Sequence, residues 1–79
     1  MEEHILAEGC RNGDDTARRE LYDRYAGRLL AICMRYSGDR STAEDLLHDA
    51  FLKIYGAFDR FTYRGPGSLR AWIERITVN

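Results

Sequence analysis

The chain has 79 residues, of which 44% are hydrophobic and 32% are charged, so we expect one small globular domain with a modest core. No apolar run approaches the ~20 residues that a membrane-spanning helix requires. The acidic start, MEEHILAEG, lacks the basic-then-apolar layout of a signal peptide, and a cytoplasmic location is therefore the expectation.

The net charge of −1 hides an uneven distribution. Residues 1–50 carry 7 Arg against 11 Asp and Glu, a balance of −4. Residues 51–79 carry Lys53 and 4 Arg against Asp59 and Glu74, a balance of +3. A split of this kind is consistent with two partners of opposite charge, but solvated helix faces without any partner would produce it too.

Helical periodicity dominates the first half of the chain, and no sustained alternation indicates a strand. We expect a first helix over residues 2–11 that ends at Asn-Gly, residues 12–13, and whose thin apolar face predicts loose docking. Asp14 or Asp15 is expected to cap a second helix that ends at residues 37–39. The core-facing stripe of that helix is predicted to be Leu21, Tyr22, Tyr25, Leu29, Ile32, Cys33 and Tyr36.

A third helix is predicted from an S-x-x-E capping box at residues 41–44. Its apolar stripe is Leu46, Leu47, Ala50, Phe51, Ile54, Tyr55 and Phe58. Pro66-Gly67 breaks the chain, and Ser68 is expected to cap a fourth helix with an apolar face at residues 69–76. Because that helix reaches Asn79 without a stop signal, we expect the natural protein to continue. The predicted fold is an all-α, compact bundle of three to four helices.

Motifs of known catalytic chemistry are missing from the sequence. It contains no phosphate-binding loop, no serine-hydrolase elbow and no paired C-x-x-C. Asp45, His48 and Asp49 come nearest to a metal site, but a closed site needs further ligands. Cys10 and Cys33 are expected to be reduced, with Cys33 in the core. We therefore expect no enzyme activity and no cofactor.

The stretch FDRFTYRGPGSLRAW, residues 58–72, interleaves four aromatic residues with three arginines and two glycines. Aromatic rings stack on unpaired bases, arginines contact phosphates, and glycines let a strand approach the backbone closely. The spacing assigns Phe58 to the core, whereas Phe61, Tyr63 and Trp72 are less easily placed there. From these residues alone, single-stranded nucleic-acid binding and a simple helix-packing loop both stay open.

Several motifs in order resemble a known family. The runs AEDLLHDAFLKIY at residues 43–55 and WIERITVN at residues 72–79 resemble region 2 of bacterial RNA polymerase sigma factors, above all the extracytoplasmic-function (ECF) group. LYDRY at residues 21–25 resembles the second helix of that region. The resemblance implies that residues 1–79 form one sigma region 2 domain, and we expect its last helix to be truncated and the region 4 domain to be absent from this sequence.

The resemblance implies that the third helix binds core RNA polymerase at the clamp helices of the β′ subunit. A row of carboxylates suits such a basic coiled coil through electrostatic complementarity. At His48 this chain departs from the glutamine usual in the family. The matching positions are Glu44, Asp45, His48, Asp49, Phe51 and Tyr55.

The resemblance also implies that the loop and the last helix melt the −10 promoter element and hold a flipped non-template base. By position, the base pocket comprises Lys53, Ala57, Phe61 and Asn79, with residues 63–68 around it. Trp72 is expected to pack under the loop. The full set of expected DNA-binding positions is Lys53, Ala57, Phe61, Tyr63, Arg64, Gly65, Ser68, Arg70, Arg75 and Asn79.

The implied partners are core RNA polymerase, single-stranded non-template promoter DNA and an anti-sigma factor, with no membrane. Two alternatives remain. A small helical protein-interaction adaptor would bury Tyr63 and would not bind nucleic acid. A duplex-reading helix-turn-helix domain would need a basic recognition helix, and residues 69–79 are only mildly basic.

Overall fold

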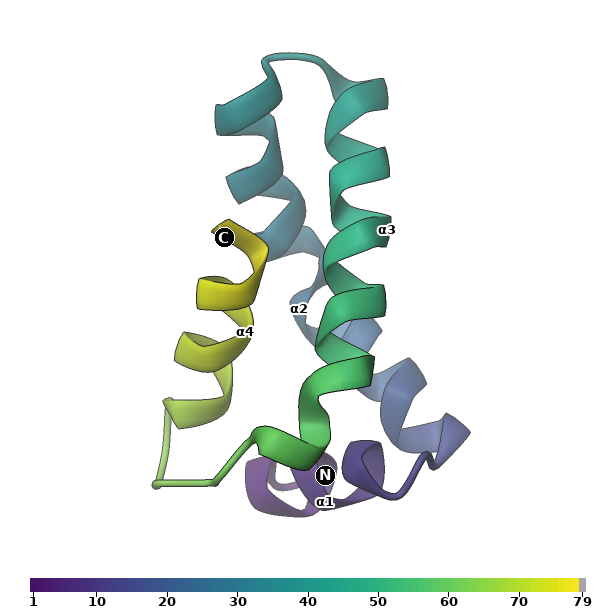
Figure 1. Cartoon of the computed structure of the whole chain (residues 1–79), viewed down its shortest axis with the longest axis vertical. Helices are drawn as coiled ribbons and strands as arrows, with labels where there is room; N and C mark the ends of the chain where they lie inside the picture. The colour runs from purple at the N-terminus through teal and green to yellow at the C-terminus, as the bar shows by residue number, and fades with distance from the viewer. Residues whose placement is uncertain (79) are drawn as a thin grey trace.

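The computed structural model describes residues 1–78, and the predicted all-α fold is confirmed for them. A 3-10 turn, η1 (Phe58–Arg60), follows the third helix, and a loop connects it to the fourth. In Figure 1, α1 and this loop lie at one end of the bundle, and the turn between α2 and α3 lies at the other. The four helices are α1 (Glu3–Arg11), α2 (Asp15–Ser37), α3 (Arg40–Ala57) and α4 (Ser68–Val78).

Helix α2 is the central element, since it packs against α1, α3 and α4. Burial of each large apolar side chain contributes about 1.5–3 kcal/mol. The predicted stripes were too wide, because Tyr22, Tyr36 and Leu46 are 45%, 70% and 40% exposed. A bundle of this size covers only the middle of each stripe and leaves its edges in solvent. The largest fully buried apolar side chains are Leu6, Leu21, Leu29, Ile54, Phe58, Leu69 and Ile73.

Helix α1 is firmly docked, so the expectation of loose docking was wrong. Leu6, Ala7 and Cys10 are at most 2% exposed. Small residues let the backbones of α1 and α2 approach closely: a Cβ added to Gly9 would lie 2.6 Å from the Cβ of Ala17. The thin apolar face of α1 is therefore enough to dock this helix, because the backbones of α1 and α2 lie in close contact.

The caps of α2 and α3 are both aspartates. Asp14 accepts a hydrogen bond from the Thr16 N–H at 2.9 Å, as one of the two predicted choices. The predicted capping box at residues 41–44 was wrong, because α3 begins at Arg40 with Asp39 as its cap. The Asp39 carboxylate accepts from the Thr42 N–H at 2.9 Å and from the Thr42 hydroxyl at 2.7 Å.

The cap of α4 also differs from the prediction, which assigned it to Ser68. The Ser68 hydroxyl instead accepts from the Arg64 N–H at 3.1 Å, inside the loop. The carboxylate of Glu3 in α1 accepts from the N–H groups of Gly67 at 3.2 Å and Leu69 at 3.0 Å. A residue far away in the chain thus satisfies the start of α4.

We predict that Gly9→Ala destabilises the protein by about 1–3 kcal/mol, because the added methyl forces α1 away from α2. Urea unfolding measures the change. Gly27→Ala in α2 is the control: a Cβ there meets nothing within 4 Å, so stability should rise by about 0.5–1 kcal/mol. Equal behaviour of the two variants would contradict the close α1–α2 contact.

Acid titration should reveal the Asp39 cap. Hydrogen bonds from the Thr42 side chain and N–H lower the pKa of Asp39. The stabilisation by the cap is complete above the unfolded-state pKa of about 3.9 and disappears as pH falls through the lower folded-state value. Asp39→Ala should therefore lower the urea midpoint at neutral pH, and the gap to the unmodified chain should close in acid. A gap independent of pH would contradict this assignment.

Candidate protein and nucleic-acid interfaces

The predicted polymerase-binding residues occupy two adjacent rows on α3. The side chains of Glu44, Asp45, His48 and Asp49 are all exposed. Glu44 pairs with Arg40 at 3.2 Å, whereas Asp45 and Asp49 form no ion pair with another residue among 1–78. The carboxylates of Asp45 and Asp49 are therefore available to a basic partner.

The second row faces a groove between α2 and α3, of about 410 Å³. Phe51 is only 3% exposed, and the Tyr22 ring lies 4.8 Å from it, centroid to centroid. Tyr55 is half-buried, and its hydroxyl donates to the Arg18 carbonyl at 3.1 Å. Phe51 thus belongs to the floor of the groove rather than to its rim. The α2–α3 groove is lined by Tyr22, Ala26, Gly27, Leu30, Arg40, Glu44, Leu47, His48, Phe51, Leu52 and Tyr55.

A second hollow, also of about 410 Å³, lies between the loop and α4. Three arginines surround it, and none of them forms an ion pair with another described residue. The sequence predicted Phe61, Arg64, Ser68 and Arg75 as DNA-binding residues, and the structure brings these four together here. This loop hollow is lined by Arg60, Phe61, Thr62, Arg64, Ser68, Ala71, Trp72 and Arg75.

Aromatic rings form the inner wall of the loop hollow. The Trp72 ring lies 4.9 Å from that of Phe58 and 4.8 Å from that of Phe61. Phe61 is 5% exposed and therefore mainly supports the hollow, while the half-buried Trp72 retains accessible surface. Trp72 packs against the rings of Phe58 and Phe61, as expected of a residue that supports the loop, and the contact role expected of Phe61 stays a prediction.

Three other predicted DNA-binding residues lie apart from the loop hollow. Ala57 is 8% exposed and faces the core. Lys53 borders a separate hollow of about 270 Å³ between α3 and the end of α4, together with Asp49. Tyr63 lies in a groove beside α1, with its ring 5.9 Å from that of His4. Lys53, Phe61 and Tyr63 thus border three different hollows, and their common role in DNA binding stays a prediction.

The remaining predicted positions are scattered. Gly65 adopts a φ of 108°, a conformation that favours glycine and shapes the loop. Arg70 is exposed on α4, where its Nε lies 3.7 Å from the Glu74 carboxylate, outside the loop hollow. Asn79 lies outside the described residues.

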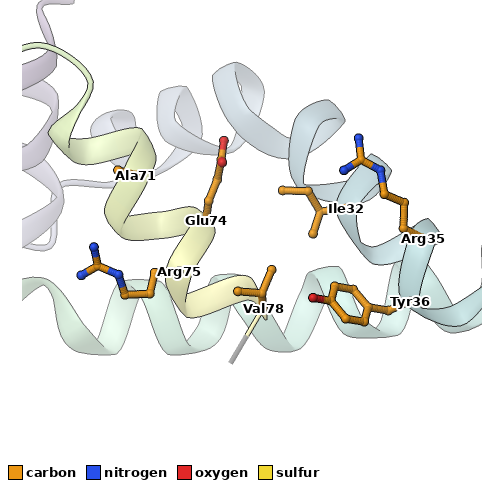
Figure 2. Close-up of a pocket in the computed structure, with 7 residues that line it drawn as sticks. All are labelled: Ile32, Arg35, Tyr36, Ala71, Glu74, Arg75 and Val78. Atoms are coloured by element: carbon orange, nitrogen blue, oxygen red, sulfur yellow. The ribbon is translucent and has the colours of Figure 1, made fainter.

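A further hollow of about 600 Å³, which the sequence analysis did not predict, lies between α2 and α4. Figure 2 shows Glu74, Arg75 and Val78 on the α4 side of this hollow and Ile32, Arg35 and Tyr36 on the α2 side. Arg75 borders this α2–α4 hollow and the loop hollow, so the two adjoin. Tyr36 lines this hollow and is 70% exposed, although the sequence analysis assigned it to a core stripe.

Residues 1–78 contain neither a metal-ligand cluster nor a membrane-spanning helix. No group of three or more His, Cys, Asp or Glu side chains there is arranged to hold a metal ion. None of the described helices combines the length and apolarity needed to cross a bilayer.

Burial raises the pKa of the Cys10 thiol to about 11, and Cys33 is buried as well, so both thiols are poor nucleophiles at neutral pH.

Comparison with known proteins assigns the chain to a family. Residues 21–79 match the family model described as sigma-70 region 2. The chain is 41% identical over 69 residues to the ECF RNA polymerase sigma factor SigG of Mycobacterium tuberculosis, which covers 87% of this chain and 17% of that protein. It is 35% identical over 81 residues to the ECF RNA polymerase sigma-E factor of Escherichia coli, covering 100% of this chain and 40% of the relative.

A third relative is the RNA polymerase sigma-H factor of Pseudomonas aeruginosa, 32% identical over 74 residues, or 94% of this chain and 37% of that protein. This chain thus spans two fifths or less of the length of these three relatives. Family model and relatives agree over the same helices that carry the two candidate interfaces. The chain belongs to the sigma-70 region 2 family, and its relatives are ECF RNA polymerase sigma factors.

Proposed function

We propose that residues 1–79 act as one region 2 domain of an ECF sigma factor, which binds core RNA polymerase and promoter DNA in the cytoplasm during transcription initiation. Its role is binding rather than catalysis. The observation that carries the proposal is the position of Arg60, Arg64 and Arg75 around a hollow walled by aromatic rings, in a chain whose net charge is −1. Family membership supports the same reading.

The loop hollow is the proposed site for an unpaired promoter base. Its volume lies within the range of about 300–1,000 Å³ typical of ligand pockets. A base turned out of the stack enters beside Trp72, where stacking on an aromatic ring is worth about 1–3 kcal/mol. Phe61 holds Trp72 from behind, and the three arginines bind the flanking phosphates. Gly65 and Ser68 set the shape of the loop.

Other predicted DNA-binding residues then contact the strand away from the flipped base. Lys53 and Tyr63 lie on neighbouring surfaces, and Ala57 acts through the core. Arg70 extends the basic charge of α4, and we keep Asn79 as a base-reading residue by its position in the sequence alone. Arg35, which no sequence motif indicated, lines the α2–α4 hollow together with Arg75 and adds positive charge there.

The exposed face of α3 is the proposed polymerase contact. Asp45 and Asp49 supply unpaired carboxylates for the basic clamp helices of β′, and Glu44 and His48 stand at the rim of the adjoining α2–α3 groove. Phe51 and Tyr55 shape that groove from below. An anti-sigma factor is a further proposed partner for this domain.

Removing the arginines of the loop hollow should weaken single-strand binding. Arg64→Ala and Arg75→Ala should each reduce affinity about tenfold at low salt, because each removes a charged hydrogen bond to phosphate. Each should also lower the slope of log affinity against log salt by about 0.7. The measurement is the fluorescence anisotropy of short labelled strands that differ one base at a time. Trp72, the sole tryptophan, reports occupancy of the hollow by quenching.

Arg19→Ala is the matched control, since Arg19 is exposed and borders neither hollow next to α4. It removes the same charge and should leave the affinity nearly unchanged. Equal affinity for every sequence, with no quenching of Trp72, would rule out a base-specific hollow. Equal losses in all three variants would mean that only total charge matters.

Charge reversal on α3 should abolish polymerase binding. Asp45→Arg with Asp49→Arg places cations opposite the basic clamp helices, and such like-charge contacts cost several kcal/mol. Binding to a β′ clamp-helix fragment, measured by calorimetry, should fall by more than about a hundredfold. Glu2→Arg with Asp59→Arg makes the same change in net charge at exposed sites elsewhere and should bind normally. If the α3 variant keeps its helical circular dichroism spectrum and still binds, the polymerase interface does not lie on this face of α3.

One observation favours the helical adaptor as a second candidate. The Tyr63 side chain is half-buried against α1. The adaptor hypothesis expects a buried Tyr63, whereas a nucleic-acid strand bound at Arg64 would favour an exposed one. The adaptor has no affinity for nucleic acid at any salt concentration, so the same anisotropy titration separates the two functions.

A further inference from the structure

The segment that builds the loop hollow is anchored at its start by α1. Arg11 donates from Nε to the Phe58 carbonyl at 3.2 Å and from Nη2 to the Phe61 carbonyl. Its Nη1 also binds the Glu8 carboxylate at 2.7 Å, which holds the guanidinium in place. These contacts join positions 47 and 50 residues apart, and they satisfy carbonyls at the exit of α3.

The same helix anchors the end of the segment. The two carboxylate oxygens of Glu3 accept the N–H groups of Gly67 and Leu69, which open α4. A negative charge at this place is favoured by the helix dipole. Figure 1 shows α1 lying at the same end of the bundle as the loop.

Between these anchors the loop has little to order it. Gly65 and Gly67 adopt φ values of 108° and 87°, and glycine loses more conformational freedom on ordering than other residues. Two local hydrogen bonds also order the loop, from the Arg64 N–H to the Ser68 hydroxyl and from the Ser68 N–H to the Gly65 carbonyl, both at 3.1 Å. The Tyr63 ring lies 5.9 Å from the ring of His4, a contact that again involves α1. The shape of the loop hollow thus depends on the first helix.

We propose that Glu3 and Arg11 are positioning residues for single-strand binding. They fix residues 58–69 in the shape that gathers Arg60, Arg64 and Trp72, and they do not touch the strand. This inference rests on the proposed function of the loop hollow.

A different role for Glu3 predicts that its removal changes the single-strand affinity in the opposite direction. The N-terminus of a helix is a natural phosphate site, and Glu3 occupies that of α4. If Glu3 excluded a phosphate there, its removal would strengthen binding. Loss of a negative charge would strengthen binding in any case by general electrostatics. Only a positioning role makes the loss of this carboxylate weaken the complex.

The experiment compares three variants of the 79-residue chain by anisotropy with labelled oligo-dT and with a labelled mixed-sequence strand. Glu3→Ala should bind both strands about tenfold more weakly, the effect expected of losing a helix cap. Glu3→Gln keeps one acceptor and should be intermediate. Glu2→Ala removes the same charge from a side chain that is 74% exposed and whose carboxylate lies 3.7 Å from the His4 imidazole, and it should bind no more weakly than the unmodified chain.

Amide hydrogen exchange on the same variants tests positioning without DNA. In Glu3→Ala, the amides of Gly67 and Leu69 should exchange faster, while core amides such as that of Leu29 keep their protection. Binding that is equal or tighter in Glu3→Ala overturns the positioning role. If the unmodified chain binds neither strand, the proposed function fails, and unchanged exchange at Leu69 would separately overturn the anchoring of the loop.

Discussion

The packing of Trp72 against Phe58 and Phe61 is the contact on which the architecture of the candidate DNA surface depends. It joins the end of α3 to the face of α4, with ring centroids 4.9 and 4.8 Å apart. Because these rings fill the core from one side, the arginines of the same segment must point outward. One aromatic cluster therefore supplies both apolar burial for a small domain and the wall of the loop hollow.

The small size of the domain explains why α1 supports the loop as well as packing its thin apolar face against the core. Within residues 1–78 the core is modest, and the glycine-rich loop finds its support at both ends in α1. Helix α1 supplies that support with a close backbone contact at Gly9 and with charged side chains, Glu3 and Arg11, that satisfy backbone groups at both ends of the loop. Hydrogen bonds between charged side chains and backbone groups are among the stronger kinds in proteins.

Two surfaces of opposite charge coexist because separate helices carry them. Among residues 1–78, Asp45 and Asp49 on α3 form no ion pair, and neither do Arg60, Arg64 and Arg75 around the loop hollow. Opposite charges on one small body steer an acidic and a basic partner to different faces. The net charge of −1 conceals this arrangement, which the uneven distribution along the chain already indicated.

Sequence alone determined the helical content, the approximate ends of the helices, the exposed carboxylates of α3 and the family, because periodicity, turn residues and motifs are local signals. Tertiary structure decided what depends on distances between remote segments. It placed the side chains of Lys53 and Tyr63 at other hollows than that of Arg64, and it buried Phe61 in the core. It also replaced the expected Ser68 cap with Glu3, which is 66 residues away from Leu69 in the sequence. These outcomes follow from how closely helices cross and which side chains then meet, and no pattern within a single helix contains that information.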